Sequence, residues 1–429
     1  MRKRRHIKPA PLLALAGMAA LSLPAFAQQP GPALPAGSAE QAIPYSPTGA
    51  AASQSGGASP AGGITLKLMD MLITAYPSVR LELQHNDNIY STASNKTGDL
   101  ILVLTPALRL ETRRAGNTFA LRMSSAIGQY QNNKTDNYTN TNVNGRADLD
   151  LGTRLRARVE ADYTDGVDPR GSTNNPLSAT PDHYHQTRGQ GSFSYGAQGA
   201  RGRLDLELGQ LRREYVNNRA ITAANDRTVD DFGATFHWRV GPKTSLLFQG
   251  KHSKVDYDLP ASTLSSVENA FLAGATWEAT AKTSGTFRFG MTKKDFDASA
   301  RGSSTTISWT GQVRWSPRTY SHVDASLNRA PAETTGGVGN FIDRTVTGAR
   351  WSHEWSNRLT TEATASYATD AYRGVARTDN TQNYGLRATY KMRRWISFGG
   401  DYAHTVRSSD DSNFDYKRNV FMLFLNATL

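Results

Sequence analysis

The chain contains no cysteine among its 429 residues, and this absence removes several classes of protein from consideration. A disulfide framework, a thiol nucleophile and a cysteine-based zinc site are all excluded. Folding therefore requires no oxidising compartment.

Long apolar runs are also missing beyond the N-terminal segment. No later stretch is long enough to cross a bilayer as a helix, which takes about 20 apolar residues. The mean hydropathy of −0.53 would by itself indicate a protein that stays in water. That conclusion fails for transmembrane β-barrels, because their strands alternate apolar and polar side chains and average to a polar value.

The N-terminal segment 1–27 has the three parts of a secretory signal peptide. "MRKRRHIK" is cationic, "PLLALAGMAALSL" is apolar, and Ala25-Phe26-Ala27 supplies the small residues for cleavage before Gln28. The segment carries five basic residues, so cleavage lowers the formal charge from +12 to 12 − 5 = +7. This mild positive charge gives little support for a nucleic-acid partner, and we expect none.

Residues 28–75 are predicted to connect the signal peptide to the folded region. Most of the segment is rich in Ala, Pro, Gly and Ser and nearly uncharged, which is typical of a flexible periplasmic linker. Its last part, "ITLKLMDMLITA" (64–75), is apolar. Three structures fit this short segment: a first strand, a plug helix or a partner-binding helix.

From Tyr76 onward the sequence alternates between apolar and polar residues with a period of two. "RLRARVEADY" (154–163) has charged side chains at its even positions and apolar ones at its odd positions. Because successive side chains of a strand point to opposite faces, this strand has one charged and one apolar face. The alternating runs are about 11 to 15 residues long, which suits tilted transmembrane strands.

The connections between these runs are alternately short and long. Turns such as "RAGN" (114–117) and "GPKT" (241–244) alternate with polar loops, the longest of which is 166–182. Eight short turns and nine long loops divide residues 76–429 into eighteen strands. The sequence therefore predicts an all-β fold: a transmembrane antiparallel up-and-down β-barrel in the outer membrane of a Gram-negative cell, with outer-membrane lipids around it.

Aromatic residues recur at both ends of the predicted strands. We expect a ring of tryptophans beside the periplasmic turns, made of Trp238, Trp277, Trp315, Trp355 and Trp395. We expect a ring of tyrosines at the outer ends, made of Tyr90, Tyr130, Tyr163, Tyr215 and Tyr257. Two such rings are typical of a bilayer with two interfaces. The final "VFMLFLNATL" (420–429) also alternates and ends on an apolar residue, so we expect the barrel-assembly machinery to recognise it.

No arrangement of residues indicates catalysis or a cofactor. We find no nucleophile beside a base, no phosphate-binding loop and no glycine-rich nucleotide signature. His183 and His185 share one strand face beside Asp182, a spacing that suits a metal ion, but the sequence supplies no third ligand. We therefore predict no metal site, no cofactor and no enzymatic activity.

The charged strand faces are expected to line a water-filled lumen. The residues that we assign to this wall are Arg122, Arg146, Arg154, Arg156, Arg158, Asp148, Asp150, Glu160 and Asp162. Two hypotheses describe the wall: a ladder of ion pairs that supports it, or an arginine track for anionic sugars. The loop 166–182 is a candidate constriction. If the loop folds inward, its charged residues Asp168, Arg170 and Asp182 have candidate partners in the wall residues Arg154, Arg156, Arg158 and Glu160. The alternative is a polar loop, rich in Ser, Thr and Asn, that extends into solvent.

The stretches "YPSVRLELQHNDNIY" (76–90) and "TPALRLET" (105–112) resemble the first two strands of β-barrel porins that Gram-negative bacteria often encode with exopolysaccharide genes. The shared feature is a Pro-Ser-hydrophobic strand that ends here in Asp87, Asn88 and Ile89. In architecture the resemblance covers residues 76–429. It implies a role in exporting or assembling an exopolysaccharide, with the polymer and periplasmic export components as partners, and it carries over no catalytic residues.

The same barrel suits other functions. A general or substrate-specific diffusion porin for small solutes is the first alternative to export. A non-conducting structural barrel is the second.

Overall fold

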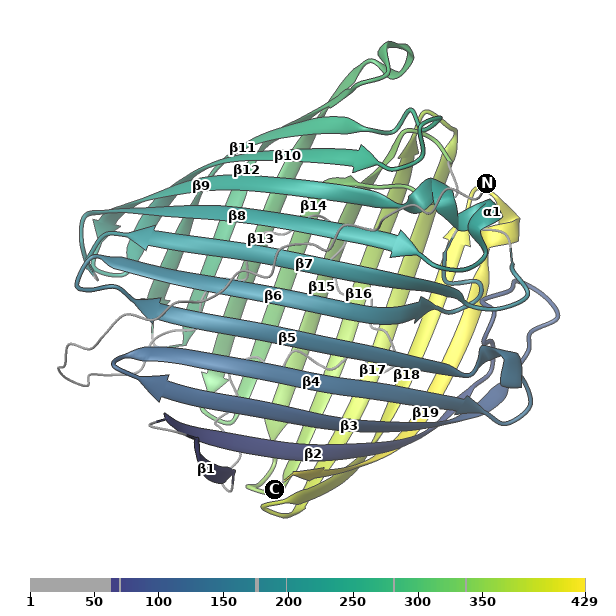
Figure 1. Cartoon of the computed structure of the whole chain (residues 1–429), viewed down its shortest axis with the longest axis horizontal. Coiled ribbons are helices and arrows are strands. Elements are labelled where there is room, and N and C mark those ends of the chain that lie inside the picture. The colour runs from purple at the N-terminus through teal and green to yellow at the C-terminus, as the bar shows by residue number, and fades with distance from the viewer. Residues whose placement is uncertain are drawn as a thin grey trace, which may run out of the picture.

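The computed structural model describes residues 63–68, 71–173, 177–197, 199–280, 282–335 and 338–428. The predicted signal peptide (1–27) and most of the predicted linker lie outside these residues, as does the last residue, Leu429. The described chain consists mainly of long β-strands that run side by side (Figure 1).

The strands follow one another along the chain with few interruptions. The first ten are β1 (Ile64–Leu68), β2 (Met71–Asn86), β3 (Asp99–Arg114), β4 (Asn117–Tyr130), β5 (Tyr138–Asp150), β6 (Leu155–Asp168), β7 (Asp182–Tyr195), β8 (Gly202–Tyr215), β9 (Arg227–Gly241) and β10 (Thr244–Tyr257). The other nine are β11 (Ser266–Thr280), β12 (Thr283–Phe296), β13 (Ser303–Arg318), β14 (Ser321–Ala332), β15 (Phe341–Glu354), β16 (Leu359–Arg373), β17 (Arg377–Arg393), β18 (Ile396–Ser409) and β19 (Tyr416–Thr428).

Helical turns occur only in connections of the described chain. They are the short α-helix α1 (Arg219–Thr222) and the 3-10 helices η2 (Lys134–Asp136), η3 (Ala223–Asn225), η4 (Ser299–Arg301) and η5 (Ser412–Phe414). None of the helices in the described part is long and apolar enough to cross a membrane.

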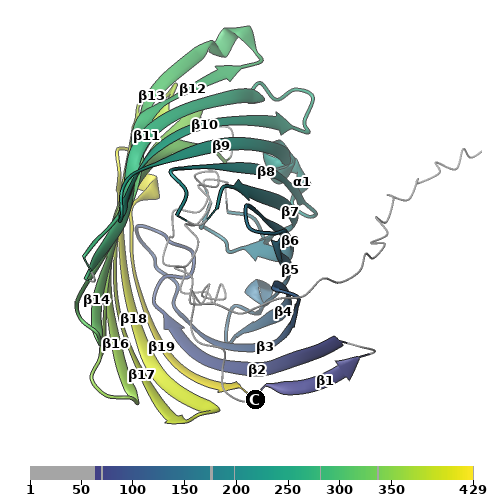
Figure 2. The ribbon, with the colours of Figure 1, turned by 90° about the vertical axis from the view of Figure 1, so that its left-hand side faces the viewer.

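Each strand from β2 to β19 pairs antiparallel with its neighbour in the chain, and the last pairs with the first. This closing contact runs from Val420 opposite Asn86 to Thr428 opposite Ser78. The sheet has 19 strands including β1, so the closed wall has 19 − 1 = 18 strands, as predicted. Figure 2 shows the strands arranged around a common axis. Closure pairs strand edges that would otherwise be exposed, which is required of a sheet in hydrocarbon.

The two faces of the wall differ in the way that the alternation predicts. On β19, Phe421 and Leu423 are 55% and 66% exposed, whereas their neighbours Val420 and Met422 are nearly buried. A row of exposed large apolar side chains is unfavourable in water but matches the hydrocarbon of a bilayer. The outer face of the barrel is therefore the lipid-facing one.

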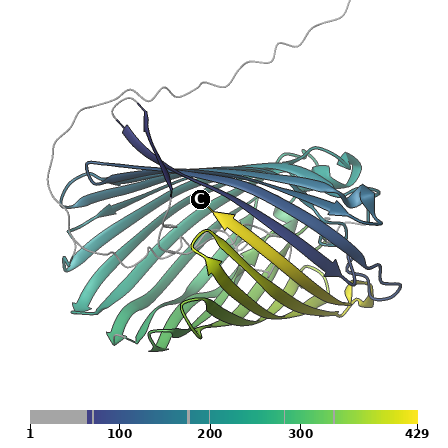
Figure 3. The same cartoon turned by 90° about the horizontal axis from the view of Figure 1, so that it is seen from below.

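The apolar segment 64–75 forms a hairpin, which decides among the three structures that fit its sequence. β1 pairs with the beginning of β2, from Ile64 opposite Ala75 to Leu68 opposite Met71. β2 begins at Met71, before Tyr76, and its first residues, 71–75, pair with β1. The hairpin extends beyond the neighbouring strands of the wall (Figure 3).

Short turns lie at one end of the barrel and longer connections at the other, as predicted. The β3–β4 turn consists of Ala115 and Gly116, both with positive φ (48° and 83°), which is typical of a two-residue hairpin turn. At the opposite end lie the longer loops, with α1 and η3 between β8 and β9 (Figure 1). By the arrangement typical of outer-membrane barrels, the short-turn end is periplasmic and the other end is the outer one.

The β14–β15 hairpin leaves the regular wall at its outer end. β13 pairs with β12 as far as Ser303, but its pairing with β14 ends at Trp309, opposite Arg329. Phe341, at the start of β15, is 1% exposed and packs in an apolar cluster with Phe296 of β12. The tip of the hairpin therefore leans against the side of β12 that faces the lumen.

Candidate functional site

Most of the predicted lumen residues lie on three neighbouring strands, β4, β5 and β6. On β6 they alternate with Val159 and Tyr163, which are exposed on the outer face, so the charged side chains point inward. The register places them opposite one another: Asp148 with Arg158, Arg146 with Glu160, Asp150 with Arg156, and Asn144 with Asp162.

The centre of this wall is a set of shared polar contacts. The Asp148 carboxylate accepts hydrogen bonds from Arg158, at 2.5 Å, and from Arg146, at 2.6 Å to its terminal nitrogen. The Asn144 amide donates to Glu160 at 2.9 Å and to Asp162 at 2.7 Å. This region therefore has the ion pairs that the ladder hypothesis requires.

Two arginines of the wall are not part of this ladder. Arg122 lies opposite Arg109 in the register and is exposed to the lumen. In the described part of the chain, no carboxylate lies within 4.0 Å of the Arg122 or Arg156 guanidinium. The assignment of Arg154 to the wall is wrong, because Arg154 precedes β6 and lies exposed in the short turn.

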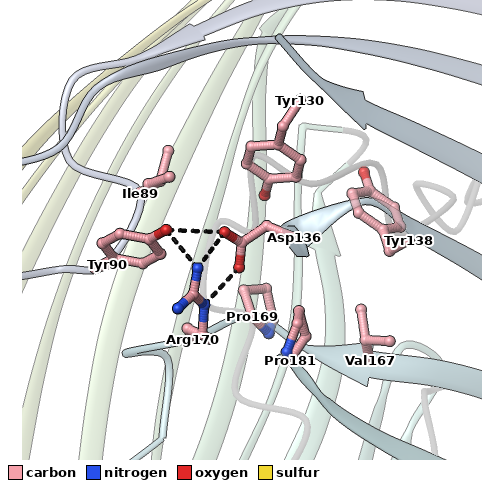
Figure 4. A pocket seen from close by; sticks show the side chains of 9 residues that line it. All are labelled: Ile89, Tyr90, Tyr130, Asp136, Tyr138, Val167, Pro169, Arg170 and Pro181. Carbon is pink, nitrogen blue, oxygen red and sulfur yellow. Dashed lines mark hydrogen bonds and ion pairs between the residues drawn. The ribbon is translucent and has the colours of Figure 1, made fainter. Parts of the chain in front are cut away.

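Three outer loops meet at Tyr90, Asp136 and Arg170, which we call the mouth cluster (Figure 4). Arg170 donates two hydrogen bonds to the Asp136 carboxylate, from Nε at 2.7 Å and from a terminal nitrogen at 2.6 Å. The Tyr90 hydroxyl donates to the same carboxylate at 2.9 Å. The Arg170 guanidinium also stacks over the Tyr90 ring, 4.4 Å from its centroid.

Burial strengthens the mouth cluster. Asp136 is 5% exposed, and Ile89, Tyr130 and Tyr138 line the same small pocket. Burial raises the pKa of the Tyr90 phenol, and its hydrogen bond to Asp136 raises that pKa further. The Asp136 hydrogen bond also raises the pKa of Arg170. At neutral pH the Tyr90 phenol therefore stays protonated and the Arg170 guanidinium stays charged.

Close backbone contact joins the same loops. Gly171 has a φ of +74°, and a Cβ atom at this position would lie 1.9 Å from the carbonyl oxygen of Tyr90. Only glycine accommodates both this conformation and this approach. The beginning of the loop after β6 thus lies directly against the loop after β2.

The predicted docking site of the loop 166–182 is wrong. Asp168 binds Arg213 at 2.9 Å and the Tyr215 hydroxyl at 2.7 Å, and Asp182 accepts a hydrogen bond from Asn218 at 2.7 Å. Of the expected partners, Arg154 precedes β6, and Arg156, Arg158 and Glu160 lie in its periplasmic half. A strand rises about 3.3 Å per residue, so the loop cannot reach them without crossing much of the barrel.

The predicted outer ring of tyrosines is also wrong, except at Tyr163, which is 39% exposed on the outer face. Tyr130, Tyr215 and Tyr257 are buried on the inner face, where outer loops and neighbouring strands cover them. Tyr90 belongs to the mouth cluster.

The periplasmic tryptophans fit their prediction better. The exposed members of this ring are Trp238, Trp315, Trp355 and Trp395. Trp277 instead lines a groove of about 490 Å³ with Phe287, Leu327 and Tyr367.

A second contact at the outer end holds the β14–β15 hairpin, and we call it the lysine latch. Lys294 of β12 donates to Glu268 at 2.7 Å and to Glu333 at 2.6 Å. The Tyr257 hydroxyl also donates to Glu333, at 2.8 Å. Since Glu333 follows β14, these bonds fix the base of the hairpin loop against β10, β11 and β12.

Most residues of both clusters carry no recognisable signal in the sequence. Asp136, Lys294 and Glu333 are ordinary charged residues in or beside polar loops, and their spacing carries no motif. Tyr130 offered one signal: it shares the even-numbered phase of β4 with the lumen residue Arg122, so alternation alone places it inside the barrel.

Comparison with known proteins places the chain in a family. Residues 73–429 match the family described as "Putative beta-barrel porin 2". The chain belongs to this porin family. It is thus a porin-type channel protein of the outer membrane. No match was found among curated proteins.

Solved structures with similarity to this porin include three from Pseudomonas aeruginosa. OpdO has a TM-score of 0.48 and 12% identity over 83% of this chain and 97% of its own. OpdL has a TM-score of 0.46 and 12% identity, over 83% and 98%. OccK2 (OpdF), solved in complex with glucuronate, gives the same four values as OpdL.

Proposed function

We propose that this porin is a non-catalytic channel that takes part in exporting an exopolysaccharide. The observation that carries the proposal is the inner wall of β4, β5 and β6, where arginines, carboxylates and amides face the lumen side by side. A sugar chain presents hydroxyl groups along its whole length, and each of these side chains donates or accepts hydrogen bonds to hydroxyls.

The wall suits passage better than tight binding. Asp148 and Glu160 already hydrogen-bond to wall side chains. A passing sugar hydroxyl would therefore replace an existing hydrogen bond and gain little net binding energy. Conduction requires sites that are favourable enough to enter and weak enough to leave. Arg122 and Arg156 add positive charge without a bound carboxylate, which favours a polymer with acidic groups.

The resemblance of residues 76–90 to porins encoded with exopolysaccharide genes supports the same proposal. Membership of the β-barrel porin family is consistent with it and does not distinguish a polymer from a small solute.

A diffusion porin for small solutes is the second candidate, and the outer mouth favours it. The mouth cluster and the lysine latch hold loop segments and the β14–β15 hairpin against the inner wall. Fixed loops at a mouth restrict the size of what passes. Under the export proposal, these loops must leave a path for a single sugar chain.

Conductance and polymer block distinguish the candidates. The purified barrel is inserted into a planar bilayer, and acidic oligosaccharides of increasing length are added to the short-turn side. Export predicts transient current blocks whose duration grows with chain length, and Arg122→Gln with Arg156→Gln should shorten them. Blocks by monosaccharides alone would support the small-solute porin, and a silent bilayer would contradict both candidates.

A cellular experiment complements the bilayer measurement. Deletion of the gene should abolish or reduce the surface polysaccharide, and the wild-type gene should restore it. Val375→Thr, in the short outer connection between β16 and β17, serves as a matched surface control and should restore export fully.

A further inference from the structure

Two histidines and one aspartate meet on the outer surface of the barrel, at the outer ends of β6 and β7. His183 and His185 are alternate residues of β7, so both side chains leave the sheet on one face. Asp165 of β6 lies directly opposite His185 in the register. Asp165 also shares its phase with Tyr163, which is exposed on the outer face. All three side chains therefore point away from the lumen.

The ligand atoms of the three side chains converge. The Nε2 atom of His183 contacts Oδ1 of Asp165, and Nε2 of His185 lies 3.7 Å from the same oxygen. One ligand atom from each residue lies within 4.8 Å of the others. The side chains are 34%, 44% and 35% exposed for His183, His185 and Asp165, and Asp165 lies beyond the outward-facing Tyr163 toward the outer loops, so an ion reaches them from the outer solution.

We propose that Asp165, His183 and His185 bind a divalent transition-metal ion of the Zn²⁺ class across β6 and β7. Two imidazole nitrogens and one carboxylate oxygen suit Zn²⁺, whereas Mg²⁺ and Ca²⁺ prefer ligands that are all oxygen. Three protein ligands leave one tetrahedral position for water or for a group from outside the barrel.

The surrounding structure holds the backbone of His183 in place. The His183 backbone nitrogen donates to the Asn217 side chain at 2.7 Å, and the His183 carbonyl accepts from Val216 at 2.8 Å. Glu214 of β8 lies opposite His185, but its carboxylate contacts Arg212 at 3.5 Å and does not join the three converging ligand atoms. A bound ion would tie β6 to β7 beside the two ends of the loop 169–181.

The test uses the full barrel without a polyhistidine tag, folded in detergent and freed of metal with a chelator. Zn²⁺ is titrated by calorimetry, and Co²⁺ is added as a spectroscopic probe. The wild type should bind one ion and give the absorption bands of tetrahedral Co²⁺. His183→Gln and His185→Gln should each weaken binding at least tenfold. His252→Gln is the matched control, since His252 also faces outward on β10 but hydrogen-bonds to Asn269 instead of a carboxylate.

Two results would overturn the proposal: Zn²⁺ binding that persists unchanged in both variants, or equal competition by Mg²⁺. A measurement on the wild type guards against variants that fail to fold. Zn²⁺ should protect His183 and His185 from diethylpyrocarbonate, as read by peptide mass spectrometry, and leave His252 unprotected. Equal modification with and without Zn²⁺ would refute the site.

Discussion

Near the periplasmic turns, Asp148 shares its carboxylate between Arg146 and Arg158, and all three side chains remain 27–35% exposed. Near the outer loops, Lys294 lies between Glu268 and Glu333 and is only 1% exposed. Both sets are ion pairs on the inner face of one barrel. They differ in how much water reaches them.

That difference separates two roles. A wet ion pair contributes little to stability, typically 0 to about 1 kcal/mol, and leaves its groups free to meet a solute. Removing one partner of a buried pair leaves an uncompensated charge and is strongly destabilising. The periplasmic half of the lumen wall is therefore suited to contact with a solute. The half near the outer loops is suited to holding those loops in place.

The largest expected effect comes from the lysine latch. Lys294→Met should lower the free energy of unfolding by about 3–5 kcal/mol, because Glu268 and Glu333 would then lie buried without their cation. Urea titration of the barrel in lipid vesicles measures this change. Arg146→Gln, in the wet ladder, is the matched control and should cost at most about 1 kcal/mol. An equal decrease in the free energy of unfolding in the two variants would contradict the proposed difference between the periplasmic and outer ends of the lumen wall.

The second prediction compares the two faces of β6. It tests whether substitutions near the periplasmic end are tolerated because the side chain faces the lumen, and not because of its position along the strand. Val159 follows Arg158 of the ladder but lies on the lipid face, so Val159→Arg should cost up to roughly 2–4 kcal/mol, the value for an arginine at the bilayer midplane, and less the nearer the site lies to the interface. Arg156→Gln should leave stability nearly unchanged and should alter ion selectivity. Refolding titrations and reversal potentials measure the two outcomes. Similar tolerance of both substitutions would contradict the assignment of faces.

The mouth cluster should affect conductance more than stability. Deleting residues 170–179 should raise single-channel conductance severalfold if the loop narrows the outer mouth. Arg170→Gln keeps the loop but removes its ion pair with Asp136. This variant should increase current noise and raise mean conductance less than the deletion does. A deletion variant that folds and conducts like the wild type would exclude this loop as the constriction.

The smallest effect is expected outside the wall, at the periplasmic turns. Their exposed basic residues are Arg114, Arg201, Lys243, Lys282, Arg318, Arg358, Arg393 and Arg394. Neutralising four of them should modestly lower export, and added salt should have a similar effect in vitro, because the ring would attract an acidic polymer or a periplasmic partner. If export is unchanged while the barrel inserts normally, attraction to anionic lipid headgroups is the remaining explanation.

The barrel itself could be predicted because its signal is local. On β6, Val159 and Tyr163 alternate with Arg158 and Glu160, and the structure places the two sets on opposite faces. The two-residue period follows from the geometry of one extended backbone, so it can be recognised in each strand separately. The same rule, applied to Tyr130, would have placed this residue inside and corrected the predicted ring.

The outer mouth could not be predicted in the same way. The docking partners predicted for Asp168 and Arg170 are wrong, because complementary charge does not specify which strand or loop a charged side chain contacts. The actual partners, Arg213 and Asp136, belong to other hairpins. Which loop bends over which strand depends on strand tilt and on the β14–β15 departure from the wall, and neither has a periodic signature.

The sequence alone determined that this chain is an eighteen-stranded barrel with a wet inner face and an apolar outer face, since both features repeat in every strand. Only the tertiary structure decided which side chains meet across loops and strands. Asp165 joins His183 and His185 because the register of β6 and β7 places them together. Lys294 meets Glu333 because a hairpin leans inward. Such contacts depend on how separate segments pack, and no single segment carries that information.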